Sequence, residues 1–159
     1  MLSNIIVKYI IVFLVSMVPL IELRGAIPIA VGLGLDKLIS FVIAIVGNMI
    51  PVPIIYLFAR KVLEWGKDKK FIGKFFTWCL NKGERGGKKL EAKAGRGLYW
   101  ALFIFVGIPL PGTGAWTGTL AASMLKLDFK KTVLAVVAGV LLAGLIMMAV
   151  SFGLFEVIF

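Results

Sequence analysis

The chain has 159 residues, of which 60% are hydrophobic and 16% are charged. Soluble domains average roughly 45–50% apolar and about 25% charged residues, so this composition excludes an ordinary soluble domain and predicts a protein embedded in the lipid bilayer. The length allows one compact membrane domain, residues 1–159. The net charge of +10 is concentrated beside apolar segments, which favours anchoring at the cytoplasmic membrane face over nucleic-acid binding.

Enzyme chemistry is not indicated by the residue types that are present. The chain has no histidine and one cysteine, Cys79, and a lone cysteine forms neither an internal disulfide nor a metal site by itself. The sequence also lacks a second intramembrane acid and a phosphate-cradling loop motif. We therefore predict that the protein is not an enzyme and that it holds no metal and no cofactor.

Four apolar stretches follow one another along the chain and differ in length. A spanning helix needs about 20 apolar residues, whereas roughly 10–14 residues are typical of a re-entrant or buried segment. The stretches 38–59 and 132–154 have 22 and 23 residues and are long enough to span. The stretches 9–21 and 98–110 have 13 residues each, so we predict that they enter the bilayer without crossing it alone.

Each short stretch ends in a break that contains proline. The first break begins at Pro19, and the second lies in the segment IPLPGTG at 108–114. Each break leads into another short apolar piece, 26–35 in one case and 115–125 in the other. Proline interrupts helical hydrogen bonding, and glycine allows the backbone to bend. The residues predicted to shape the two hairpins are Pro19, Gly25, Pro28, Pro109, Pro111, Gly112 and Gly114.

The same order of features occurs twice, which predicts an all-α integral membrane protein made of two inverted repeats. Repeat 1 comprises residues 1–60 and repeat 2 residues 97–159, and each holds a re-entrant helical hairpin followed by one transmembrane helix. With residues 61–96 in the cytoplasm of a multi-pass plasma-membrane protein, 15 of the 18 basic residues lie inside, as the positive-inside rule requires. Opposed repeats are the plan of many transporters. Four plain helices with proline kinks are the alternative.

The two repeats can be aligned at particular residues. Asp36 is matched by Asp128, and Gly47 is matched by Gly139, both with an offset of 92 positions. The matched order of features supports the repeat more strongly than the few identities do.

The cytoplasmic segment 61–96 is basic and amphipathic. Between Phe71 and Leu80 the apolar residues recur at helical spacing, while lysines occupy other faces. This pattern predicts a helix that lies on the anionic cytoplasmic leaflet, with anionic lipid as a partner. Packing of the helix on the membrane domain or on a second copy is equally compatible. The glycine-rich stretch 84–97 is predicted to be a flexible connector.

Two opposite charges, Glu22 and Arg24, lie in the first break within the apolar part of the chain. An ionisable side chain at membrane depth costs about 2.5–3.5 kcal/mol on insertion scales, so it is by default a functional-site hypothesis. The two residues could pin the turn, pair with groups across the repeat interface, or bind substrate and protons. Because the chain lacks histidine, Glu22 is the predicted proton carrier, and we favour the substrate- and proton-binding interpretation.

The second break has no charge but offers hydroxyl groups and a helix start. Thr113 and Thr117 are the predicted substrate contacts, and the free N–H groups of a helix that begins near Ala115 favour anionic groups. A tight packing motif is the plainer alternative. Asn48 lies close to Pro51 in the long apolar stretch, where its amide either satisfies backbone groups freed by proline or lines the substrate cavity.

Two segments, PLIELRGAIPIAVGLG at 19–34 and PLPGTGAWTGTLAA at 109–122, resemble the signature segments of the putative small multidrug export protein family. That family is distantly similar to the DedA superfamily of bacterial membrane proteins. The resemblance implies paired re-entrant hairpins in inverted repeats and, for DedA relatives, movement of lipid-phosphate carriers across the bilayer. The residues that match the two motifs are Glu22, Arg24 and Pro28 in the first, and Pro111, Gly112, Thr113 and Gly114 in the second.

Three functions are compatible with these features. The first is a membrane transporter or lipid-carrier flippase whose small-molecule or lipid-phosphate substrate binds between the hairpins. In this function Arg24 and the helix start hold an anionic group, and Glu22 couples transport to protons. The second is a small exporter of lipophilic cations, which Glu22 would bind. The third is a non-transport protein that shapes membranes or scaffolds partners through its basic helix. A homodimer is also expected, because the predicted bundle is thin.

Overall fold

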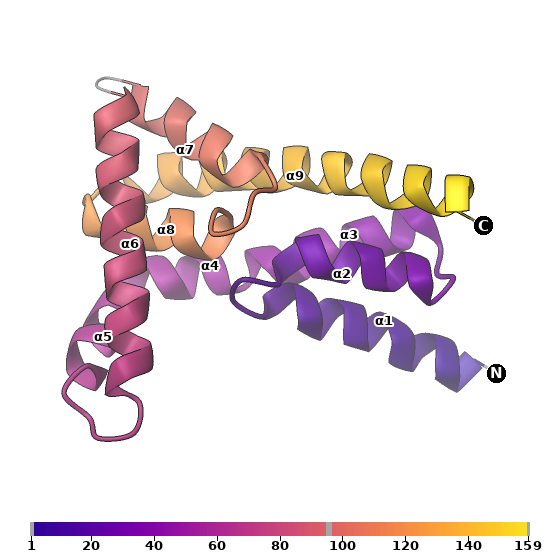
Figure 1. The fold of residues 1–159 in the computed structure, drawn as a ribbon, viewed down its shortest axis with the longest axis horizontal. Helices are drawn as coiled ribbons and strands as arrows, with labels where there is room; N and C mark the ends of the chain where they lie inside the picture. The colour runs from indigo at the N-terminus through magenta and orange to yellow at the C-terminus, as the bar shows by residue number, and fades with distance from the viewer. Residues whose placement is uncertain (1, 95–96, 159) are drawn as a thin grey trace.

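The computed structural model describes residues 2–94 and 97–158, and the regular elements in these residues are helices. Figure 1 shows a bundle of helices that is crossed at one end by a single long helix, α6. The elements in chain order are α1 Leu2–Met17, α2 Glu22–Gly32, α3 Lys37–Met49, α4 Pro51–Ile54, the π-helical turn η1 Ile55–Ala59, α5 Arg60–Gly66, α6 Gly73–Ala94, α7 Leu98–Gly107, α8 Ala115–Met124 and α9 Phe129–Ile158.

Two helical runs have the length and hydropathy of membrane spans. The first is Lys37–Phe58, which joins α3, α4 and most of η1 in 22 residues, and the second is α9, with 30 residues. Only 39% and 28% of their most apolar parts are buried, and large apolar side chains such as Leu38 and Leu134 are exposed on them. Soluble proteins rarely expose such extended apolar surface to water, whereas the apolar surface of a membrane protein faces lipid. The two predicted long apolar helices are therefore confirmed.

The first break, residues 18–21, connects α1 to α2 through a sharp turn. Leu20 and Glu22 have φ angles of 71° and 51°, a region that non-glycine residues rarely adopt. Pro19 lies in this turn. Gly25 lies in the first turns of α2, where an added Cβ would overlap the side chain of Ile21. Pro28 lies further along, at an exposed position inside α2.

The second break, residues 108–114, connects α7 to α8 and contains four of the predicted hairpin-shaping residues. Pro109 follows the last turn of α7, which ends at Gly107. Gly112 and Gly114 have positive φ angles of 83° and 127°. These residues reverse the chain within seven positions, so that α8 begins at Ala115.

Several contacts recur in the two halves of the chain. The backbone N–H of Asp36 donates to the hydroxyl of Tyr9 at 3.3 Å, and that of Asp128 donates to the hydroxyl of Tyr99 at 3.0 Å. Each aspartate also accepts a hydrogen bond from the backbone N–H three residues later, which is the usual N-cap arrangement. The predicted match between Asp36 and Asp128 thus corresponds to equivalent local structure.

The other aligned pair also makes equivalent contacts. Gly47 on α3 lies against the carbonyl oxygen of Phe13 on α1, at 2.7 Å from a hypothetical Cβ. Gly139 on α9 lies against the carbonyl oxygen of Phe103 on α7, at 2.9 Å. Small residues allow helices to approach closely within a membrane, and both long helices use a glycine for this purpose.

Replacing Gly139 with alanine should therefore lower the free energy of unfolding by about 1–3 kcal/mol, as other overpacked sites do. The new methyl group would meet the Phe103 carbonyl and the side chain of Val106. Gly153→Ala is the matched control, because nothing lies within 4 Å of a Cβ at that position of the same helix. Denaturant unfolding of both variants in detergent measures the difference, and equal stability would contradict close packing of α7 on α9.

The helix α6 corrects one prediction. The stretch 84–97 was expected to be a flexible connector, but the helix continues to Ala94, and residues 95–96 lie outside the described residues. Gly86 and Gly87 are buried, and a Cβ at Gly86 would be 3.5 Å from the methyl group of Thr117 on α8. Glycine disfavours an isolated helix, but tertiary packing overrides that propensity. The glycines here provide a flat face that packs on α8.

Candidate functional site

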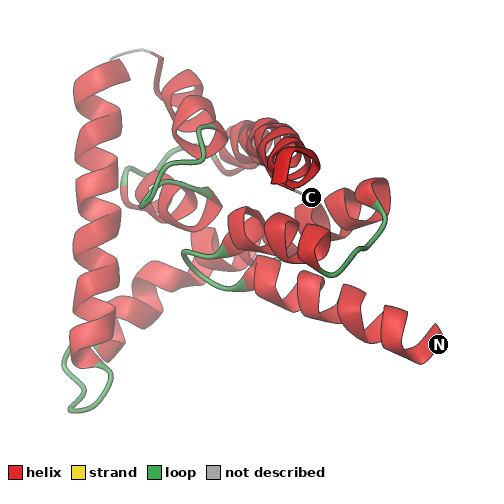
Figure 2. Cartoon of the chain, turned by 45° about the vertical axis from the view of Figure 1, so that its right-hand side comes forward, coloured by secondary structure: helices red, strands yellow, loops and turns green. Residues whose placement is uncertain are grey.

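The two breaks face one another in the middle of the bundle, as the loops in Figures 1 and 2 show. Glu22, at the start of α2, is 2% exposed. Its Oε2 accepts a hydrogen bond from the backbone N–H of Ala115 at 3.1 Å, and its Oε1 accepts one from that of Trp116 at 3.0 Å. The carboxylate therefore caps the N-terminus of α8, where the helix dipole and free N–H groups favour negative charge.

Arg24, two residues after Glu22, binds the backbone of the second break. Its guanidinium donates to the carbonyl oxygens of Leu110 at 2.8 Å, Ile108 at 3.4 Å and Thr113. It also donates to the Thr113 hydroxyl oxygen at 2.8 Å. That hydroxyl has the Ile108 and Leu110 carbonyl oxygens within 2.9 Å as acceptors for its own hydrogen. The planar donor fork of arginine suits such a cluster of oxygens.

Glu22 and Arg24 thus bind different parts of the opposite break. Both are described residues, and no ion pair joins them. The sequence left open whether Glu22 and Arg24 pair with each other or with groups across the interface between the two halves. In the structure both residues bind groups across this interface. Trp116 adds a third contact, because its indole N–H donates to the carbonyl of Met17 at 3.2 Å. We call the contacts of Glu22, Arg24 and Trp116 with the opposite half the interlock.

Asn48, on α3, lies close to the Glu22 carboxylate. Its side chain is 1% exposed, yet neither its amide nitrogen nor its oxygen has hydrogen-bond geometry to another described group. A buried amide without a partner is uncommon, because it loses the hydrogen bonds that water would give. Asn48 therefore adds a buried amide beside the Glu22 carboxylate, without a hydrogen bond of standard geometry to another described group.

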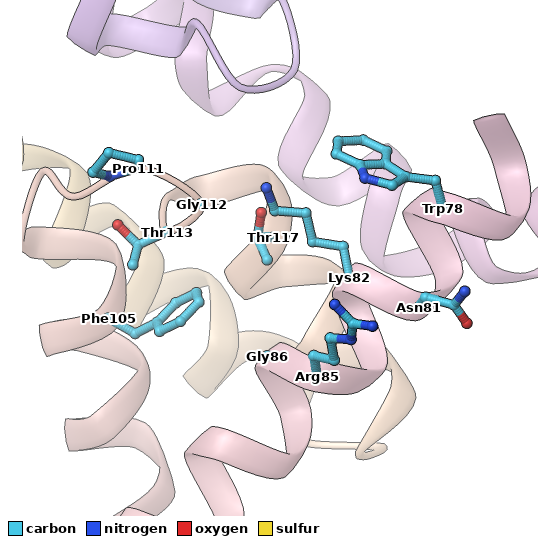
Figure 3. Close-up of a pocket in the computed structure, with 10 residues that line it drawn as sticks. All are labelled: Trp78, Asn81, Lys82, Arg85, Gly86, Phe105, Pro111, Gly112, Thr113 and Thr117. Carbon is cyan, nitrogen blue, oxygen red and sulfur yellow. The ribbon is translucent and has the colours of Figure 1, made fainter.

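A cavity of about 370 Å³ opens beside the second break, between α6, α7 and α8. Figure 3 shows it with its lining residues. We call it the α6 cavity, and its lining consists of Trp78, Asn81, Lys82, Arg85, Gly86, Phe105, Pro111, Gly112, Thr113 and Thr117.

The predicted binding residues are divided between these two places. Glu22 and Arg24 belong to the interlock, and Asn48 lies beside it. None of these three residues lines the α6 cavity, whereas Thr117 does. Thr113 belongs to both, since it binds Arg24 and also lines the cavity. Whether any of them binds substrate or protons stays a prediction.

Sequence reasoning missed Lys82 and Arg85. They are two of the 12 basic residues between positions 60 and 96, and nothing in the sequence separates them from the other ten. Within the described residues, no group of three or more His, Cys, Asp or Glu side chains is placed to hold a metal ion.

An all-helical bundle with two helices of spanning length, short broken helices and buried charges between the breaks defines a membrane protein. The family model described as putative small multi-drug export protein matches residues 22–146. The chain belongs to this family, which confirms the resemblance of its two segments. The match starts at Glu22 and includes the second break. Searches for similar curated proteins and similar solved structures gave no match.

Proposed function

We propose that the protein is a plasma-membrane transporter for anionic groups, in which the two breaks are the tips of re-entrant hairpins from opposite leaflets. The chain then comprises two inverted repeats. The recurring contacts of Tyr9 and Tyr99 with the aspartates support this relation. So does the arrangement in Figure 1, where α1 and α7 approach the centre from opposite ends.

The proposed orientation has α6 on the cytoplasmic leaflet. The helix runs across the end of the bundle (Figure 1), and the turn before it carries Phe71, which is 96% exposed. Phe75 and Trp78 of α6 are also exposed beside lysines. Aromatic and basic side chains together favour the interface of an anionic membrane, so anionic lipid is the proposed partner of this face.

The contact between Glu22 and the N-terminus of α8 is the observation that carries the proposal. A helix N-terminus is a binding site for anions, and here the protein's own carboxylate occupies it. An anionic substrate that reaches these N–H groups displaces Glu22. The displaced side chain remains inside the apolar region, where a charge is costly, so it is accommodated by taking up a proton. Substrate binding and proton uptake are thereby linked, and the two breaks are free to separate.

The family description favours a second candidate, export of cationic drugs, with Glu22 as the cation site. The geometry supports it less well. Both carboxylate oxygens of Glu22 already accept hydrogen bonds from α8, and the cavity beside the second break is lined by Lys82 and Arg85. A cation would therefore meet like charge in the cavity and an occupied carboxylate in the interlock.

Glu22→Gln tests the proposal, because glutamine keeps the shape of the side chain but does not ionise. Proteoliposomes with the wild-type chain should move a fluorescent phosphatidic acid or radioactive inorganic phosphate when a pH gradient is imposed. In Glu22→Gln this dependence on the gradient should be lost. Glu156→Gln is the control, since Glu156 is an exposed acid paired with Lys37 at 3.7 Å. Unchanged flux and pH dependence in Glu22→Gln would remove Glu22 from the mechanism.

A further inference from the structure

We propose that the α6 cavity is a binding site for a phosphate-bearing anion, held by Lys82 and Arg85. The inference deepens the proposed transport of anions, and rests on it only for the link between this site and transport. The two residues were not singled out by the sequence. They are three positions apart on α6 and therefore share one face of the helix, and both line the cavity.

The lysine reaches directly to the second break. Its amino group would be 3.4 Å from a Cβ placed on Gly112, so the absence of a side chain at position 112 lets the ammonium lie close to the loop. Figure 3 shows the Lys82 side chain extending from α6 toward Gly112 and Thr117, with the Arg85 guanidinium on the same side of the helix. An anion in the cavity would contact the ammonium, the guanidinium and the polar side chains of the loop.

The described residues that line the cavity do not balance its positive charge. The ten lining residues include two cations and no carboxylate. Lys82 contacts the ring of Trp78, with its nitrogen 5.0 Å from the ring centroid, and neither Lys82 nor Arg85 forms an ion pair with a carboxylate among the described residues. Two cations that face one cavity repel each other, and a bound anion would relieve this repulsion.

Size and position favour a phosphate. A cavity of about 370 Å³ falls in the range of small-ligand sites. Arginine binds two phosphate oxygens at once and lysine adds a point charge. The cavity also opens beside the exposed aromatic residues of α6, at the level where lipid phosphates lie if that helix rests on the leaflet. The phosphate could belong to a lipid headgroup or to a soluble molecule.

The site is connected to the interlock through Thr113. This residue lines the cavity, and its hydroxyl oxygen accepts a hydrogen bond from Arg24. A phosphate in the cavity would therefore contact the same loop that Arg24 holds against the first break. A ligand in the cavity could thereby change the contacts between Arg24 and the second break, which must be broken for the two breaks to separate.

Binding to the purified full-length chain in detergent tests the inference, with dihexanoyl phosphatidic acid and inorganic phosphate as separate calorimetric probes. The double variant Lys82→Gln/Arg85→Gln should weaken binding of at least one probe about tenfold, the scale of losing charge-assisted hydrogen bonds. Lys130→Gln/Lys131→Gln is the matched control, because it removes the same charge from two exposed lysines that do not line the cavity. Lys82→Arg/Arg85→Lys keeps both charges and should retain binding.

The outcomes separate the ligand sources and the two proposals. Cavity-dependent binding of phosphatidic acid alone assigns a lipid headgroup, and binding of both probes assigns the phosphate itself. Equal losses in the cavity pair and in the control pair, or no binding of either probe, would overturn the site. Because these measurements involve no flux, such a failure leaves the transport test of Glu22 to decide the proposed function independently.

Discussion

Replacing Glu22 with alanine should lower the free energy of unfolding by about 2–4 kcal/mol, because two buried backbone N–H groups would lose a charged acceptor. These are the N–H groups of Ala115 and Trp116 at the start of α8. The variant also removes one of the contacts that hold the two breaks together, while those of Arg24 and Trp116 remain. Chemical denaturation in detergent, followed by tryptophan fluorescence, measures the change.

The matched control for this substitution is Glu156→Ala. Glu156 pairs with Lys37, and both side chains are more than half exposed. Exposed ion pairs contribute at most about 1 kcal/mol, so the control should change stability little. If Glu22→Ala and Glu156→Ala had the same small effect, the carboxylate of Glu22 would not be the cap of α8.

Glu22→Gln separates the structural role of the residue from a role in proton transfer. Glutamine retains one oxygen that can accept a hydrogen bond, but its NH₂ group faces an N–H donor in place of the second oxygen. It should therefore recover part of the stability lost in Glu22→Ala. It should not recover transport driven by a pH gradient, because the amide does not ionise and so cannot pick up and release a proton as a carboxylate does. A variant that is stable but uncoupled would show that the carboxylate does more than cap α8.

The sequence located the interlock but did not determine its partners. A charged pair in an apolar segment stands out, so Glu22 and Arg24 could be predicted from their cost at membrane depth. Their partners are mostly backbone N–H and C=O groups of the second break. Every residue has such groups, so the sequence could not single these out. Only the fold brings position 22 against position 115.

The connection between the two halves was predicted less well, for a related reason. The local sequence around Gly86 and Gly87 predicted a flexible connector, yet these two glycines form the face of α6 that packs on α8. The α6 cavity depends on that packing. Its lysine and arginine therefore could not be distinguished in advance from the other basic residues of the segment. The long helices were predictable, because length and hydropathy alone decide whether a helix can span.

Gly114→Ala should be the most disruptive glycine substitution in the second break. Gly114 has a φ of 127°, which L-residues rarely adopt. An added Cβ would also lie 2.5 Å from Oε2 of Glu22 and 3.0 Å from its carboxyl carbon. Strain and overlap together predict a loss of about 2–4 kcal/mol in the free energy of unfolding. Gly34→Ala is the control for backbone strain alone, because Gly34 has a φ of 67° and no atom within 4 Å of a hypothetical Cβ.

A double-mutant cycle between Gly114→Ala and Glu22→Ala tests whether the overlap is with the carboxylate. Alanine at position 22 removes the atoms that the new methyl group would meet, so Gly114→Ala should cost less in that background than in the wild type. Residues in contact typically show coupling energies of about 0.5–3 kcal/mol. Additive effects would mean that the glycine serves only its backbone conformation. Coupling would mean that it is required because the carboxylate must reach the first N–H groups of α8.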